Sequence, residues 1–173
     1  MKILDSFYAL IKPDWVILDL GAGAGRQAKF MTGLGARVIA VDSQEPKEGG
    51  DLVVWNILSI EEWVVQLNED DVFDAILARN IFQFFTREII EKKLFPILSK
   101  HLKSGGFFAI ETFHKEPVPA FEHSFSSLWS VEDLKKNFVG WEVIASAMEE
   151  ENTTDLSGNL RDFYTTSLLL KKP

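Results

Sequence analysis

Three glycines at alternate positions follow a short apolar run, and they are the residues of this sequence best suited to hold a ligand. Gly21, Gly23 and Gly25 come directly after residues 16–20, whose nearly continuous apolar character predicts a strand buried on both faces. Glycine has no Cβ, so this stretch can turn sharply and let a ligand approach the backbone closely. The helix predicted to begin near Arg26 adds free N–H groups and the positive end of its dipole.

The spacing of these glycines separates several classes of ligand. The dinucleotide fingerprint G-x-G-x-x-G needs a glycine at position 26, which is Arg26 here, and this argues against an NAD-dependent oxidoreductase. A P-loop needs a Gly-Lys-Ser/Thr triplet, which the sequence lacks. The spacing fits a ligand whose amino-acid portion lies over the glycines and whose adenosine is held by later strand ends. A tight turn without any ligand is the alternative.

A carboxylate follows the second predicted strand, residues 37–41. Asp42 there can accept hydrogen bonds from both hydroxyls of a ribose, which any adenosine ligand offers. The alternative for this residue is a helix cap or a turn. In open α/β sheets ligands bind at the carboxyl ends of the strands, so Asp42 and the glycine turn are expected at the same edge.

Candidates for acid–base or metal chemistry are few. The sequence has no cysteine, which removes thiol nucleophiles, disulfides and cysteine-ligated metals. Its three histidines show no metal-ligand spacing, so no metal is expected. His114, just past the fifth predicted strand, is our candidate for contact with a substrate, and His123 is a second one; a loop or surface role is the alternative for both. Phe82 and Phe113 are expected at the strand-end rim, where one or both would wall an acceptor pocket; packing in the core is the alternative for them.

Short apolar runs alternate with longer amphipathic stretches, a pattern typical of βαβ units and a parallel sheet. Further strands are predicted over 51–55, 73–78 and 107–112, and helices over 7–12, 26–34, 60–67, 86–102 and 130–138. Pro96 is expected to kink or interrupt the fourth of these helices. Residues 141–148 and 163–170 are predicted to form a terminal antiparallel hairpin, so the fold class is α/β.

Residues 16–42, the pair Asn56-Ile57, the strand 73–78 and the turn 102–106 resemble class I S-adenosylmethionine-dependent methyltransferases, and the whole chain is similar to their tellurite-resistance methyltransferase-like branch. The resemblance implies a three-layer, Rossmann-like fold with a seven-stranded, mostly parallel sheet whose last strand is antiparallel. It implies a single domain over 1–173, with residues 1–15 as a short N-terminal helical segment. It also implies S-adenosylmethionine as cofactor and a small-molecule methyl acceptor.

Carried onto this sequence, the resemblance assigns the cofactor contacts residue by residue. The expected contacts are Asp19, Gly21, Ala22, Gly23, Asp42, Ser43, Asn56, Ile57 and Arg79. The glycine turn would contact the methionine portion, Asp42 the ribose and Ser43 the adenine. The Asn56 amide oxygen would accept from the adenine amino group, and Ile57 would offer its backbone N–H. Arg79 would lie near the methionine carboxylate or the sulfonium.

Length and charge bound the remaining possibilities. The 173 residues fit one domain, and the formal net charge of −8 lowers the expectation of a nucleic-acid partner. No apolar run approaches a membrane span and no signal peptide is recognised, so we expect a cytoplasmic protein. We expect a monomer or homodimer. A domain that binds the cofactor without turnover is the non-enzymatic alternative, because methyl transfer requires no diagnostic side chain.

Overall fold

Seven strands form one sheet in the order β3-β2-β1-β4-β5-β7-β6. The computed structural model describes residues 3–47, 52–121, 124–155 and 157–173 of the chain. The strands are β1 (Val16–Leu20), β2 (Arg37–Asp42), β3 (Val53–Ile57), β4 (Phe73–Arg79), β5 (Leu102–Val118), β6 (Glu142–Thr154) and β7 (Leu160–Lys171). Strands β1 to β5 pair in parallel, whereas β7 runs antiparallel to both β5 and β6. The predicted α/β fold with an antiparallel last strand is therefore confirmed.

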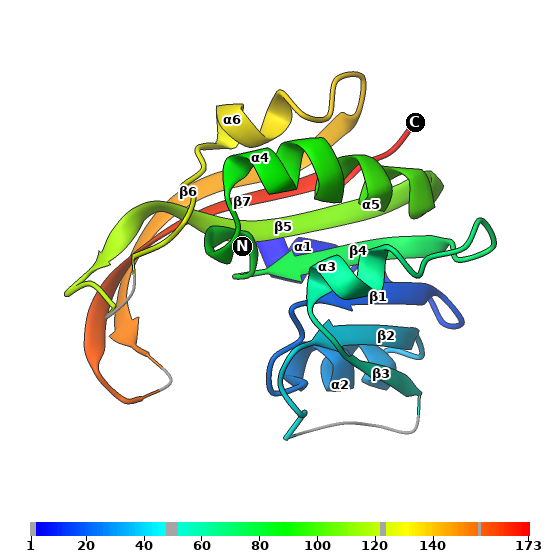
Figure 1. The fold of residues 1–173 in the computed structure, drawn as a ribbon, viewed down its shortest axis with the longest axis horizontal. Helices are drawn as coiled ribbons and strands as arrows, with labels where there is room; N and C mark the ends of the chain where they lie inside the picture. The colour runs from blue at the N-terminus through cyan, green and yellow to red at the C-terminus, as the bar shows by residue number, and fades with distance from the viewer. Residues whose placement is uncertain (1–2, 48–51, 122–123, 156) are drawn as a thin grey trace.

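Helices cover both faces of this sheet and complete three layers (Figure 1). The helices are α1 (Ile3–Tyr8), α2 (Arg26–Gly33), α3 (Ile60–Val64), α4 (Arg87–Ile89), α5 (Phe95–His101) and α6 (Val131–Lys135), with a 3-10 helix η1 (Phe82–Phe84) and a π-helix η2 (Ile90–Leu94). In the described residues, no helix is long and apolar enough to cross a membrane.

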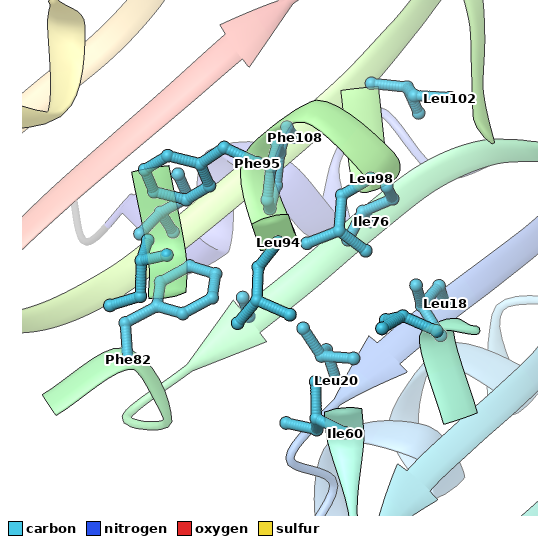
Figure 2. Close-up of a cluster of buried hydrophobic side chains, with 14 of the residues drawn as sticks. Leu18, Leu20, Ile60, Ile76, Phe82, Leu94, Phe95, Leu98, Leu102 and Phe108 are labelled. Atoms are coloured by element: carbon cyan, nitrogen blue, oxygen red, sulfur yellow. The ribbon is translucent and has the colours of Figure 1, made fainter. Parts of the chain in front are cut away.

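Each face of the sheet has its own hydrophobic core, because alternate strand residues point to opposite faces. On one face Leu18 and Ile76 meet Phe95 and Leu98 of α5, together with Phe108 of β5 (Figure 2). The other core, under α1 and α2, contains Phe7, Ile17, Met31, Ala75 and Leu77. Burial on both faces explains why the central strands are continuous apolar runs.

Local signals set the ends of several helices. The Ser59 hydroxyl accepts from the Glu62 backbone N–H at the start of α3, and Ser130 and Asp133 repeat this capping box at α6. Gly35, at a φ of 91°, follows the end of α2, and its N–H donates to the Thr32 carbonyl. These caps account for the correctly predicted starts of α3 and α6.

The α-helical hydrogen-bonding pattern is interrupted ahead of Pro96, as predicted, but the chain stays helical throughout. Thr86 caps α4, the hydrogen-bonding pattern widens to the π form over Ile90–Leu94, and α5 resumes at Phe95 with Pro96 in its first turn. Proline has no N–H to donate, so a change in the helical ladder just ahead of it is the expected response.

Strand β5 is much longer than the six residues predicted, and this is the main correction to the fold. It runs on to Val118 because β7 pairs with it from Thr166 to Asp162, and β6 pairs with β7 in turn from Met148 to Asn152. The extensions, residues 112–118, 148–154 and 160–166, form a three-stranded arm that projects past the carboxyl ends of the other strands and bends (Figure 1). His114 therefore lies inside a strand, and the placement just past it was wrong.

Other boundaries moved by a few residues. Helix α1 covers Ile3–Tyr8 and not 7–12, since Ile3 and Phe7 lie one turn apart and are both buried. Strand β3 covers Val53–Ile57, so the pair Asn56-Ile57 belongs to the strand itself; residue 51 lies outside the described part. Helix α3 ends at Val64 and not at Leu67.

Candidate functional site

The glycine turn between β1 and α2 is held against the end of β2. The backbone N–H groups of Gly21 and Ala22 both donate to the Val41 carbonyl, at 2.8 and 3.1 Å. Gly21 adopts a φ of 76° and Gly23 a φ of 55°, a backbone conformation that residues other than glycine rarely adopt. No atom lies within 4 Å of where a Cβ on Gly23 would stand. The turn therefore presents open backbone at Gly23, at the carboxyl edge of the sheet.

Asp42, the last residue of β2, is aimed at this turn. Its Oδ2 accepts from the Gly23 N–H at 2.8 Å, and its Oδ1 accepts from the Gln44 N–H at 2.8 Å. Each carboxylate oxygen keeps a second lone pair, so the group can accept further hydrogen bonds from a ligand. Ser43 follows it and is exposed. The predicted ribose partner thus lies beside the glycines.

The end of β3 completes this side of the site. Ile57 is the strand partner of Asp42, and Asn56 is the partner of Val41. Asn56 is half-buried, whereas Ile57 is 50% exposed. The sheet thus brings together the predicted residues of β1, β2 and β3 at one edge.

Asp19 lies deeper in β1 and is 1% exposed. Burial raises the pKa of its carboxyl to about 7, and the nearby Asp42 charge adds to the rise, while Arg79 and a hydrogen bond from the Ala28 N–H oppose it. Its Oδ2 has no hydrogen-bond partner in the structure. An unpartnered buried carboxyl oxygen beside the turn is a feature that a bound donor would satisfy.

Arg79, at the end of β4, forms an ion pair that sequence reasoning missed. Its Nε lies 2.7 Å from Oε1 of Glu111, the directly paired residue of β5. Tyr8 of α1 stands in the same electrostatic environment: burial raises its pKa to about 12, and the charges of Arg79, Asp19 and Glu111 also act on it. The regular spacing of strand ends could have indicated Glu111, whereas no sequence signal marked Tyr8.

Tyr8 ties the N-terminal helix to the helix after the glycine turn. Its hydroxyl donates to Oε1 of Gln27 at 2.7 Å, and its ring lies 4.6 Å from that of Phe30. Helix α1 is thereby fixed over the α2 side of the site.

The open turn, the aimed Asp42 carboxylate and the orphaned Asp19 oxygen fit a ligand with an adenosine at one end and hydrogen-bond donors at the other. In the described residues, no group of three or more His, Asp or Glu is arranged to hold a metal.

The acid–base candidates lie apart from this cluster. The His114 ring contacts β7, with Nδ1 3.1 Å from the Thr165 carbonyl oxygen and 3.3 Å from the Thr166 hydroxyl. His123 lies outside the described residues. Phe82 is fully buried and packs edge-on against Phe95, so its expected place at the rim was wrong.

A family match accounts for nearly the whole chain. Residues 4–169 match the family described as "Tellurite resistance protein TehB". The chain belongs to the TehB family. The resemblance drawn from its motifs is confirmed: a class I methyltransferase fold of the TehB-like branch.

Two relatives show how far the sequence similarity extends. The probable S-adenosyl-L-methionine-dependent methyltransferase TehB of Haemophilus influenzae is 27% identical over 168 residues, which cover 90% of this chain and 57% of that protein. This TehB-family chain therefore spans little more than half the length of that relative. The cypemycin N-terminal methyltransferase of a Streptomyces species is 35% identical over 97 residues, covering 52% of this chain and 38% of that protein.

Solved structures share the fold. The crystal structure of TehB from Haemophilus influenzae covers 99% of this chain and is itself covered to 61%, with a TM-score of 0.76 at 20% identity. A Burkholderia thailandensis 1,6-didemethyltoxoflavin-N1-methyltransferase, solved with that acceptor and S-adenosylhomocysteine, gives a TM-score of 0.68 at 19% identity and coverages of 98% and 75%. The TehB-family chain thus has the architecture of these proteins.

Proposed function

We propose that this TehB-family chain binds S-adenosylmethionine at the carboxyl edge of its sheet and transfers the methyl group to a small-molecule acceptor. The observation that carries the proposal is the Asp42 carboxylate, held 2.8 Å from the Gly23 N–H beside an open glycine turn. This geometry offers a backbone cradle for an amino-acid portion and an acceptor pair for ribose hydroxyls within one short stretch.

The remaining contacts follow from the neighbouring strand ends. Asn56 and Ile57 of β3 adjoin Asp42 and would meet the adenine, with exposed Ser43 on the other side. Arg79 would lie toward the methionine end. Its charge is offset by Glu111 at 2.7 Å, so a cationic ligand group is tolerated beside it.

The cofactor supplies a methyl group already activated by its bond to a positively charged sulfur. The task left to the protein is to orient the donor and the acceptor in line and to exclude water, and such positioning contributes up to roughly 7–11 kcal/mol in favourable cases. No dedicated catalytic side chain is therefore required. His114 stays a candidate for acceptor contact, because it lies on the arm past the carboxyl ends of the parallel strands.

The named relatives support this proposal. One is a probable S-adenosyl-L-methionine-dependent methyltransferase, and another fold neighbour was solved with a small-molecule acceptor and S-adenosylhomocysteine. We extend the small-molecule acceptor to this chain on the strength of those names. One domain, a cytoplasmic location and a monomeric or homodimeric state stay predictions from the sequence.

Calorimetric titration tests the cofactor. We expect S-adenosylmethionine and S-adenosylhomocysteine to bind and NAD not to bind. Asp42→Ala should weaken both adenosyl ligands by about 5- to 150-fold, because hydrogen bonds of about 1–3 kcal/mol to a partly buried hydroxyl pair are lost.

Asp70→Ala is the matched control, since Asp70 is an exposed turn residue ahead of β4, at the opposite edge of the sheet. The Asp70→Ala variant should bind both adenosyl ligands with the affinity of the unmodified protein. Unchanged affinity in Asp42→Ala, or binding of NAD in preference, would show that the site is wrongly placed. Formation of S-adenosylhomocysteine with a panel of small acceptors separates an enzyme from a domain that only binds the cofactor.

A further inference from the structure

A cluster of aromatic rings lies where the arm meets η1 and the segment between β5 and α6. The cluster consists of Phe84, Phe113, Phe121, Phe125 and Phe163. Phe125 is at its centre, 4.9 Å from Phe113, 5.9 Å from Phe121 and 6.2 Å from Phe84. Phe84 is 61% exposed, so the cluster opens to solvent at that ring.

A carboxylate with an unused oxygen adjoins these rings. Oε1 of Glu116 accepts from the Phe125 N–H at 2.7 Å, whereas Oε2 is buried and has no hydrogen-bond partner among the described residues. The pairing of β5 with β7 is irregular between Phe113 and Lys115 and again between Lys115 and Val118, the stretch that contains Glu116. Irregularities of this kind re-aim side chains and are frequent beside active sites. A buried carboxylate oxygen without a donor is costly unless a ligand or water supplies one.

Two more unused acceptors lie next to the cluster. Nε2 of Gln83 donates to the Asn80 backbone carbonyl at 2.6 Å, which fixes the orientation of the amide and leaves its Oε1 buried without a partner. Oδ1 of Asn80 is likewise buried and unpartnered. The Gln83 carbonyl accepts from the Ser126 N–H at 2.7 Å, so this pair is connected to the loop that carries Phe125.

The cations of the arm are already engaged. Among the described residues of its three strands these are Lys115 and Arg161. The Lys115 ammonium lies 4.0 Å from the centre of the Tyr164 ring. Arg161 pairs with Asp155 at 2.6 Å and stacks 4.5 Å from the centre of the Phe121 ring. This surface therefore offers rings and acceptor oxygens to a ligand, whereas its two cationic side chains contact groups of the protein itself.

We propose that this surface binds the methyl acceptor and selects a ring-bearing molecule with an amine, held by the phenylalanines and by hydrogen bonds to Glu116 and the Asn80–Gln83 pair. The inference rests on the proposed methyltransferase function and names the substrate class of that site. Aromatic rings with a carboxylate favour a cation or N–H donor. An oxyanion such as tellurite would meet acceptor oxygens without a donor.

Calorimetry on protein saturated with S-adenosylhomocysteine tests this class of ligand. The probes are tryptamine, its alcohol counterpart tryptophol, and tellurite. We expect tryptamine to bind at least about tenfold more tightly than tryptophol, the effect of a hydrogen bond to a charged group. Glu116→Gln keeps an oxygen for the Phe125 N–H and should weaken tryptamine about tenfold with little change for tryptophol. Phe84→Ala should weaken both.

Glu142→Gln is the matched control, because it removes the same charge at the exposed start of β6, away from the arm; it should leave all affinities unchanged. Equal binding of tryptamine and tryptophol, indifference of tryptamine to Glu116→Gln, or preferential binding of tellurite would each overturn the inference. If S-adenosylhomocysteine itself fails to bind, the proposed function fails. If it binds while the amine shows no preference, only the acceptor class is wrong.

Discussion

Replacing Asp19 with asparagine tests the electrostatics at the base of the candidate site. Burial raises the pKa of this carboxyl from 3.8 to about 7, so the native state holds a proton that the unfolded chain has already released near neutral pH. A carboxyl with a raised pKa makes the native protein less stable as pH rises from about 4 to about 7, and the effect levels off above the native pKa. Asparagine cannot ionise and removes this contribution.

The size of the effect follows from the shift. One pKa unit corresponds to about 1.4 kcal/mol, so the full shift is worth on the order of 4 kcal/mol. Because the isoelectric point is near 4.9, a practical range begins at about pH 5.5. About 1.5 pH units separate this lower limit from the native pKa of Asp19. The free energy of unfolding of the variant should therefore gain about 2 kcal/mol relative to the unmodified protein across that range.

Urea unfolding at several pH values from about 5.5 to about 8 measures this difference. Any fixed cost of the amide shifts the whole curve and leaves its slope unchanged, so the slope alone carries the test. Glu142→Gln, an exposed acid-to-amide change, should show no such slope. A difference between Asp19→Asn and the unmodified protein that stays constant over the range would mean that Asp19 ionises like an exposed carboxyl, and the reasoning would be refuted.

Two further substitutions test the scaffold. Gly21→Ala should lower the free energy of unfolding by about 1–2 kcal/mol through backbone strain, and by a further amount because the new Cβ would stand 2.7 Å from the Ile81 side chain. Gly105 has nearly the same φ and nothing within 4 Å, so Gly105→Ala measures the strain alone. Denaturant unfolding compares the two variants, and equal losses of stability would contradict the overlap with Ile81. Ser130→Ala should cost about 1 kcal/mol in the same assay by removing the cap from the Asp133 N–H, and an unchanged midpoint would show that α6 does not depend on its cap.

The placement of the glycine turn beside Asp42 could be predicted from the sequence because its geometry is local. A glycine turn after a buried strand and a carboxylate at the end of the next strand need only the parallel order of neighbours to come together. The hydrogen bond from the Gly23 N–H to Asp42 is the direct product of that order. The cofactor-binding roles of all these residues stay predictions, including those of Ser43, Asn56 and Ile57, which the structure brings to the same edge.

The surface proposed for the acceptor could not be predicted in the same way, because it depends on how far strands pair beyond the sheet. The polar stretch 112–118 gave no strand signal of its own, and only pairing with β7 extends β5 to Val118. The contact of Glu116 with the Phe125 N–H lies in this extension. Tyr8 was missed for a similar reason, since its partner Gln27 belongs to another helix.

The charges around the site explain why a buried carboxyl is tolerated there. Burial raises the pKa of Asp19 to about 7 at the expense of stability, and Arg79, which is paired with Glu111, lowers it only in part. A positively charged ligand group beside Asp19 would favour its ionised form and take the place of that proton. The oxygen that is unpartnered in the structure would then become the strongest acceptor in the site. Burial of Asp19 therefore lowers the stability of the protein without ligand and raises its affinity for a cationic ligand. The proposed methyl donor carries such a positive charge.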